Sequence, residues 1–215
     1  MKPDGTAKVR AVDHFSWSYA HGRKKRRRKD VKSESVNGHF SRGKSIRHDH
    51  LDDLHAASKL LFEVVGEVPG LWKVDIDAAF RRVPLKESDK WAAVVAYLLD
   101  GVAWTATHCG MPFGATASVE AWDRVGALIL ELARKLLRLA VFRYVDDYFG
   151  AERRELMAHA MQTLVRLVRA LFGDDSISER KVECGASLVV LGIQVRVLSP
   201  RLECFLHECC YVFVL

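Results

Sequence analysis

The sequence contains no long apolar run and few cysteines. No stretch of its 215 residues reaches the ~18 consecutive apolar residues that a membrane-spanning helix needs. The N-terminus has no continuous apolar segment that would serve as a signal peptide. The five cysteines are odd in number and follow no disulfide-framework spacing. These absences predict an intracellular protein with no membrane partner.

The basic residues are concentrated near the N-terminus. Residues 1–50 contain 14 Lys or Arg and 5 Asp or Glu, a net charge of +9, whereas residues 51–215 contain 19 and 22, a net charge of −3. Residues 21–30, HGRKKRRRKD, have no apolar residue, and like charges this dense resist folding. Such an arm is typical of a nuclear-localisation signal, of a phosphate-binding segment or of a solvated tail. A basic arm on a near-neutral body favours a polyanionic partner, most often nucleic acid.

Hydrophobic periodicity predicts an α+β protein. Helical spacing covers residues 51–65, 118–139 and 152–172, and strand-like runs cover 71–76, 140–150 and 187–198. Asp100-Gly101 between two apolar runs predicts a hairpin. Without that hairpin, the order after Gly70 is β-α-β-β-α-β, the ferredoxin-like arrangement with an antiparallel sheet and two helices on one face.

Three aspartates are the candidate catalytic residues. Asp75 ends the first strand, and Asp146 and Asp147 lie where two short strands meet. In this order the first and second strands are expected to lie side by side at the sheet centre, which brings Asp75 next to the Asp146-Asp147 turn. Carboxylates that meet at one sheet edge repel unless a cation lies between them. Carboxylate oxygens suit Mg²⁺ and Mn²⁺, and two such ions promote phosphoryl transfer. An isolated Asp-Asp is usually a polar turn, but this pair has apolar flanks and follows Tyr144.

The sequence resembles reverse transcriptases in five stretches that occur in that family's order between about Lys73 and Val195. They are DIDAAFRRVPL with Asp75 and Phe80, MPFGATASVEAW with Pro112, Gly114, Ser118 and Trp122, the Tyr-x-Asp-Asp of Tyr144 to Asp147, Lys181 after the second helix, and VVLGIQV with Leu191-Gly192. The first two stretches are most similar to retrotransposon enzymes of the DIRS type, which pair the polymerase with a tyrosine recombinase. KVRAVDHFSWS is similar to the fingers segment of that group, with His14 in place of its second Asp.

This resemblance implies a reverse-transcriptase-like palm on the ferredoxin-like core, with partial fingers and no thumb. The implied organisation is a basic arm with partial fingers over residues 1–50, a palm and fingers core over 51–198, and an atypical tail over 199–215. The chain is therefore expected to be truncated.

The resemblance also implies an RNA-directed DNA polymerase. It would add deoxynucleotides to a primer 3′-hydroxyl on an RNA or DNA template by two-metal phosphoryl transfer, with two Mg²⁺ or Mn²⁺ ions. The implied metal ligands are Asp75, Asp146, Asp147 and the carbonyl of Ile76, and the ring of Phe80 would exclude a 2′-hydroxyl. Other implied nucleotide-binding residues are Lys8, Arg10, Phe113, Gly114 and Lys181. The implied template and primer contacts are Ser118, Tyr144, Leu191, Gly192, Lys24, Lys25, Arg26, Arg27 and Arg28.

Two alternatives remain open at the level of sequence. One is a catalytically inactive retroelement remnant that still binds nucleic acid. The other is an RRM-like nucleic-acid-binding module, which shares the β-α-β-β-α-β order. Phe80 also fits a packing role, and Lys181, Lys8 and Arg10 also fit solvated positions. The oligomeric state is not predicted.

Overall fold

A computed structural model describes residues 13, 15–16, 35–40 and 45–198, together with the backbone of 201–206 and 212–214. Lys8, Arg10 and the run from Lys24 to Arg28 lie outside the described residues. The chain divides into two compact units, one formed by Met1–Ser45 and Phe80–Trp122 and the other by Ile46–Ala79 and Asp123–Leu215. In the described part of the chain, no helix combines the length and the apolar character that crossing a bilayer requires.

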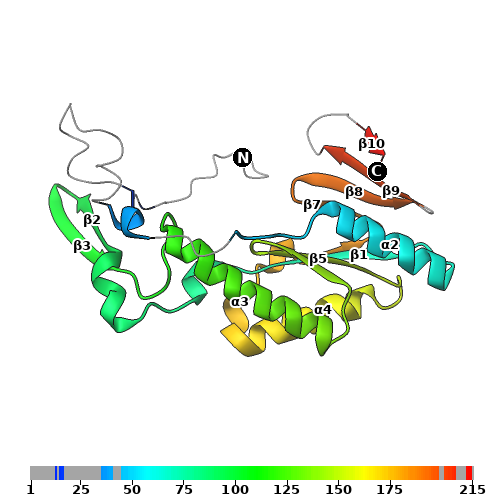
Figure 1. Cartoon of the computed structure of the whole chain (residues 1–215), viewed down its shortest axis with the longest axis horizontal. Helices are drawn as coiled ribbons and strands as arrows, with labels where there is room; N and C mark the ends of the chain where they lie inside the picture. The colour runs from blue at the N-terminus through cyan, green and yellow to red at the C-terminus, as the bar shows by residue number, and fades with distance from the viewer. Residues whose placement is uncertain are drawn as a thin grey trace. The chain divides into compact units, whose positions relative to one another are not determined.

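The second unit is built on a four-stranded antiparallel sheet with the order β4-β5-β1-β6, of which Figure 1 labels β1 and β5. Its strands are β1 (Gly70–Asp75), β4 (Val141–Tyr144), β5 (Asp147–Glu152) and β6 (Glu183–Gly185). β5 pairs with β1 along its whole length, from Gly70 opposite Glu152 to Asp75 opposite Asp147. The prediction that the first and second strands lie side by side was therefore wrong. The first strand of the predicted order pairs with the third, and the second is the edge strand β4. This is the order that a split β-α-β-β-α-β arrangement gives.

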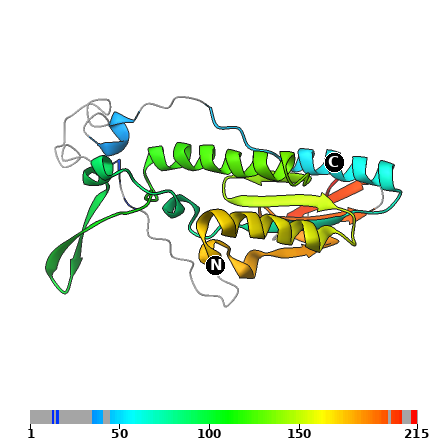
Figure 2. The same ribbon diagram turned by 90° about the horizontal axis from the view of Figure 1, so that it is seen from below.

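Helices cover one face of this sheet. Successive strand residues point to opposite sides, and on one side the Tyr148 hydroxyl donates to the Gly126 carbonyl of α3 (Thr116–Lys135) at 3.1 Å. α4 (Met157–Phe172) contacts β1 and β5 on the same side (Figure 2). Leu164 and Val168 are among the α4 residues that are fully buried. Burying each such side chain contributes about 1.5–3 kcal/mol.

The opposite face of the sheet forms a second core. Leu71 and Phe149 pack there with Leu54 of α2 (Leu51–Val65) and with residues of β7 (Ser187–Val190) and β8 (Ile193–Leu198). α2 ends at Gly66, whose φ of 78° is left-handed and favours glycine at a helix C-terminus. The helix predicted over residues 51–65 is thus confirmed at both ends.

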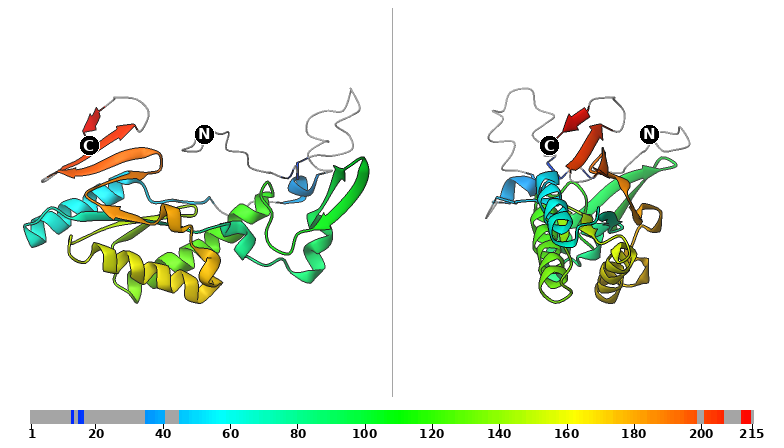
Figure 3. Two further views of the ribbon diagram at one scale, coloured as in Figure 1. Left: turned by 180° about the vertical axis from the view of Figure 1, so that it is seen from behind. Right: turned by 90° about the vertical axis from the view of Figure 1, so that its right-hand side faces the viewer.

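The prediction of one continuous strand over residues 187–198 was wrong. The chain reverses at Leu191-Gly192, so that β7 (Ser187–Val190) and β8 (Ile193–Leu198) form a hairpin. Both turn residues have positive φ, 53° and 79°, which suits a two-residue turn between antiparallel strands. β8 also pairs with β9 (Arg201–Leu206), and β9 with β10 (Val212–Val214), giving a second sheet beside α2 (Figure 3). The last strand of the first sheet is therefore the three-residue β6.

In the first unit, the predicted Asp100-Gly101 hairpin is confirmed. β2 (Val94–Leu99) and β3 (Val102–Thr107) pair antiparallel, and the two turn residues have φ of 51° and 76°. Three short 3₁₀ helices accompany the hairpin in the described residues: η2 (Val36–His39), η3 (Ala79–Arg82, which starts in the second unit) and η4 (Glu87–Ala93). Trp104 and Tyr97 are exposed cross-strand partners on the hairpin.

Candidate active site

Two of the predicted carboxylates are in direct contact. Asp75 ends β1 and Asp147 begins β5, and the two are opposite each other in the strand register. Burial first, then the negative charge of Asp146 and the neighbouring carboxyl group of Asp75, raise the pKa of Asp147 to about 7. The pair can therefore share a proton, as neighbouring carboxylates do when one pKa is strongly raised.

The end of β1 is held from both sides. The Ile76 amide donates to the Asp146 carbonyl at 3.3 Å, and the Asp77 amide donates to the Ser176 carbonyl at 2.9 Å. The Ser178 amide donates to the Asp75 carbonyl at 3.1 Å. Ile76 itself is buried. These bonds fix the backbone that carries Asp75, with little freedom to shift.

Two lysines lie near this end of the sheet, and one of them pairs with Asp75. Lys181, the last residue of the 3₁₀ helix η6 (Glu179–Lys181), places its Nζ 2.5 Å from Oδ2 of Asp75. The Asp75 side chain is only 9% exposed, whereas that of Lys181 is 42% exposed. Lys73 donates to the Val189 carbonyl at 3.0 Å and pairs with Glu183 at 3.2 Å. Lys73 thereby links β1 to β6 and β7.

A cavity of about 240 Å³ opens beside these groups. Asp75, Asp147 and Lys181 line it together with Leu191 and Gly192 of the β7–β8 turn. The structure therefore brings together site residues predicted from four separate stretches of the sequence. Val189 and Val190 of β7 also line the cavity, beside this turn.

The turn that carries Asp146 is strained and is held by Arg143. Val145 has a φ of 56°, which is unfavourable for a β-branched residue. Arg143, almost fully buried, donates from Nη1 to the Val145 carbonyl at 3.1 Å and from Nη2 to Asp123 at 2.5 Å. The Arg143 guanidinium also lies so close to Gly126 that no Cβ fits there. The packing of one arginine thus fixes the turn from β4 into β5.

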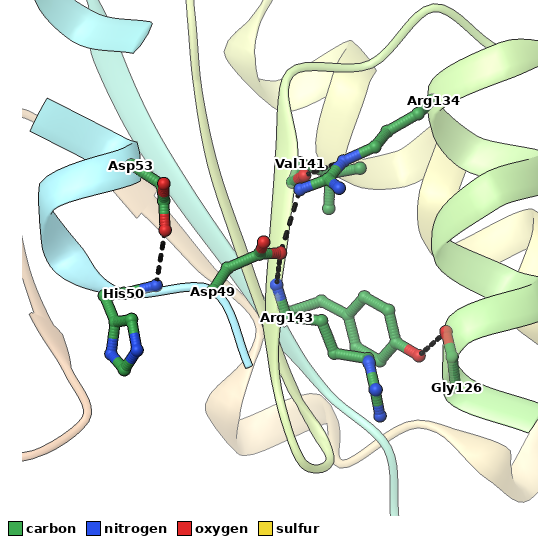
Figure 4. Close-up of polar contacts among 8 residues, drawn as sticks. Asp49, His50, Asp53, Gly126, Arg134, Val141 and Arg143 are labelled. Carbon is green, nitrogen blue, oxygen red and sulfur yellow. Dashed lines mark hydrogen bonds and ion pairs between the residues drawn. The ribbon is translucent and has the colours of Figure 1, made fainter. Parts of the chain in front are cut away.

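Asp49 supports the same strand from the segment before α2 (Figure 4). Its Oδ2 accepts hydrogen bonds from the Arg143 amide at 2.9 Å and from Nη2 of Arg134 at 2.8 Å. Nε of Arg134 in turn donates to the Val141 carbonyl at 2.8 Å. Asp49 was not predicted from the sequence, because its partners Arg134 and Arg143 lie far away in the chain.

The exposed ring of Tyr144, in the Tyr-x-Asp-Asp stretch, packs against His48. The ring centroids are 4.8 Å apart and the planes are tilted by 49°. Burial, and next the positive charge of Arg143, lower the pKa of His48, so the imidazole is neutral at physiological pH. His48 therefore supports a predicted template contact and was also missed from sequence.

In the first unit, the predicted nucleotide-binding rings lie together. The centroids of Phe80 and Phe113 are 5.1 Å apart, and the Arg81 guanidinium lies 5.8 Å from the Phe113 centroid. Asn37 holds the loop that follows: its Nδ2 donates to the Gly114 carbonyl at 2.9 Å, and its Oδ1 accepts from the Thr116 amide at 2.8 Å. Asn37 thus caps the start of α3, a role that its position in the sequence did not indicate.

The helix predicted over residues 118–139 begins before Ser118 in the structure. α3 begins at Thr116, two residues earlier than predicted, so Ser118 lies in the first turn and not at the N-cap. Its side chain is fully buried, and its hydroxyl has no hydrogen-bond partner among the described residues. Ser118 therefore packs inside this unit in the structure.

The carboxylate pair fits a hard divalent cation. Within the described residues, no group of three or more His, Cys, Asp or Glu side chains is arranged as a metal site. The Asp75–Asp147 pair offers two carboxylates beside an open cavity. Mg²⁺ is commonly bound by one or two carboxylates, with waters and substrate phosphates completing the coordination shell. The donor set is consistent with that kind of site.

The sequence matches no protein family and no curated protein. Its structure is similar to that of a foamy viral protease-reverse transcriptase, solved in complex with an RNA/DNA hybrid. The TM-score is 0.51 at 15% sequence identity, and the alignment covers 76% of this chain and 20% of that chain. At this identity the likeness concerns the fold alone, and this chain spans about a fifth of the viral chain. The mixed α/β fold with its antiparallel sheet is thus similar to part of the fold of that viral chain.

Proposed function

We propose that this chain is the palm, with part of the fingers, of an RNA-directed DNA polymerase. The observation that carries the proposal is the Asp75–Asp147 pair, which lies in register at the end of two central strands and opens on a cavity. In a binding module without catalytic activity, two neighbouring carboxyl groups would lower stability through their repulsion and would serve no function. Two carboxylates at an open edge are what a metal-dependent phosphoryl transfer needs.

In this proposal Asp75 and Asp147 hold the cation, and the predicted contributions of Asp146 and the Ile76 carbonyl complete the ligand set. Bound Mg²⁺ supplies activation of the primer 3′-hydroxyl and neutralisation of the triphosphate charge. The hydrogen bonds on either side of Ile76 hold Asp75 in place. The β7–β8 turn, with Leu191 and Gly192, supports the primer end.

The first unit is proposed to bind the nucleotide. Phe80 would fill the space that a 2′-hydroxyl needs, and Phe113 would lie against the same nucleotide. Asn37 holds the Gly114 carbonyl, so the backbone of this loop is fixed before any ligand arrives. Lys8 and Arg10 are proposed triphosphate contacts, and Lys24 to Arg28 proposed phosphate contacts of the template or primer.

The finer assignment to a DIRS-type retrotransposon stays part of the proposal. It depends on the amino-acid sequences of the two stretches DIDAAFRRVPL and MPFGATASVEAW. Nuclear localisation is also part of the proposal, and it depends on the basic run in residues 23–29.

An RRM-like module is disfavoured by burial. Such a module stacks bases on aromatic side chains that are exposed on its central strands. The aromatic residues of the central strands β1 and β5 are Trp72, Tyr148 and Phe149, and all three are at most 1% exposed. A base cannot stack on side chains that are already covered.

Primer extension tests the proposed function. The full chain is incubated with an RNA template, a DNA primer, deoxynucleotides and Mg²⁺, beside Asp75→Asn and Asp147→Asn as matched variants. The wild type should extend the primer, and each variant should lose at least about 100-fold of the rate, because a metal ligand is removed. If the folded wild type binds the hybrid without extending it, the inactive-remnant alternative takes the place of this proposal.

A further inference from the structure

The ammonium group of Lys181 occupies the open side of Asp75. Its Nζ lies 2.5 Å from Oδ2 of Asp75, so the ammonium group donates a short, charge-assisted hydrogen bond to the carboxylate. Asp75 is almost fully buried, and an unpaired buried carboxylate is costly. Lys181 therefore provides the positive charge that this carboxylate needs in the absence of a metal ion.

The backbone and the side chain of Lys181 differ in freedom. The Lys181 amide donates to the Ser178 carbonyl at 2.8 Å, and the Ser178 amide donates to the Asp75 carbonyl at 3.1 Å. The backbone of Lys181 is thus tied to the strand that it neutralises. Its side chain, by contrast, is 42% exposed and borders the cavity. The four-carbon stem can therefore move the ammonium group off Asp75 without moving the backbone.

We propose that Lys181 is an internal cation that competes with the divalent metal ion for Asp75 and moves into the neighbouring cavity when the metal binds. The inference rests on the proposed function, because it takes Asp75 as a metal ligand. It gives Lys181 a role in metal affinity that is separate from any contact with the nucleotide. Once displaced, the ammonium group lies in the cavity beside Asp147 and the β7–β8 turn, where an anionic oxygen of a substrate would meet it.

Lys73 provides a matched control. It borders the same cavity and carries the same charge, but its Nζ pairs with Glu183 and the Val189 carbonyl and not with Asp75. A change in metal affinity that arises merely from removing one positive charge nearby should appear in both Lys181→Met and Lys73→Met. A change caused by direct competition for Asp75 should appear in Lys181→Met alone.

Direct binding of Mn²⁺, followed by electron paramagnetic resonance on the full chain without nucleotide, tests the inference. Lys181→Met should lower the dissociation constant for Mn²⁺ about 3- to 5-fold, which is what the upper end of the range for a partly exposed ion pair converts to, and Lys73→Met should change it less than about 2-fold. Equal or weaker binding by Lys181→Met, or equal gains in both variants, would overturn the inference.

The same experiment separates this inference from the proposed function. If wild type binds Mn²⁺, Asp75→Asn abolishes binding and Lys181→Met has no effect, only the competition is rejected. If neither wild type nor Lys181→Met binds Mn²⁺ at millimolar concentration, the metal site fails and both proposals fall. Binding by Lys181→Met but not by wild type supports the competition in its strongest form.

Discussion

At the scale of single residues, the protonation of Asp147 is the feature with the most direct consequence. Its pKa is raised to about 7, first by burial and then by Asp146 and Asp75. The folded state therefore holds this proton more tightly than the unfolded state, in which the carboxyl has its ordinary value near 3.8. The resulting stabilisation is fully present below about pH 4 and is lost as the pH rises through about 7.

The substitution Asp147→Asn should remove this pH dependence. The free energy of unfolding of the wild type should fall between pH 4 and pH 8, and that of the variant should stay nearly level. At pH 8 the variant should be more stable by about 1–2 kcal/mol, a figure discounted because the side chain is partly exposed. Urea unfolding in metal-free buffer at several pH values measures this. The control is Asp174→Asn, at an exposed position, whose unfolding free energy should vary with pH as that of the wild type does. If the unfolding free energy of Asp147→Asn also varies with pH as the wild type does, the prediction is contradicted.

At the scale of elements, α3 depends on a glycine in its interior. Gly126 lies where the Arg143 guanidinium packs against the helix. The Gly126 carbonyl also accepts a hydrogen bond from the Tyr148 hydroxyl. Glycine normally costs a helix about 1 kcal/mol relative to alanine. Here the missing side chain makes room for the arginine that holds the strained turn at Val145.

Gly126→Ala should therefore destabilise the chain, by about 1–2 kcal/mol, although alanine is the better helix former. The added methyl group displaces Arg143 from Asp123 and from the Val145 carbonyl. Denaturant unfolding measures the effect. In an Arg143→Met background the same substitution should become neutral or stabilising, and equal losses in the two backgrounds would disprove the coupling.

Asn37 makes a similar prediction for the first unit. Asn37→Ala removes the hydrogen bonds to the Gly114 carbonyl and from the Thr116 amide, and should cost about 0.5–2 kcal/mol as the loss of a helix cap. Asn37→Asp keeps the acceptor for Thr116 and loses the donor to Gly114, so its loss should be intermediate. Thermal unfolding distinguishes the three proteins, and an alanine variant as stable as wild type would show that the cap contributes nothing.

The sequence predicted those turns and helix ends whose position is fixed by the backbone preference of a single residue. The Asp100-Gly101 turn and the end of α2 at Gly66 each depend on a residue that tolerates positive φ, and both were found. The reversal at Leu191-Gly192 was missed because apolar residues on both sides of it form one Val-rich run. Asn37, His48 and Asp49 were missed for another reason: their partners are distant in sequence, and a single polar residue does not reveal which distant group it meets.

At the scale of the whole molecule, the charge distribution predicts how the chain meets nucleic acid. Residues 1–50 carry a net charge of +9 and the remainder −3. Replacing residues 23–29 with serine should weaken binding to RNA and DNA alike. It should also flatten the dependence of log affinity on log salt, by about 0.7–0.9 for each phosphate that the arm no longer neutralises. Fluorescence anisotropy over a range of KCl concentrations measures the slope. An unchanged slope would leave this arm a localisation signal or a solvated tail.

The contact between Asp75 and Asp147 also has a consequence for the order of folding. It joins two strands that are separated in the chain by a hairpin and by α3, and the cavity beside it also needs Lys181 and the β7–β8 turn. Closing such long loops costs entropy before the contact forms, whereas the helices form from neighbouring residues. We therefore expect the carboxylates to meet late, after most of the apolar surface is buried. Their mutual repulsion then acts on the last steps of folding and leaves the early collapse of the chain unaffected.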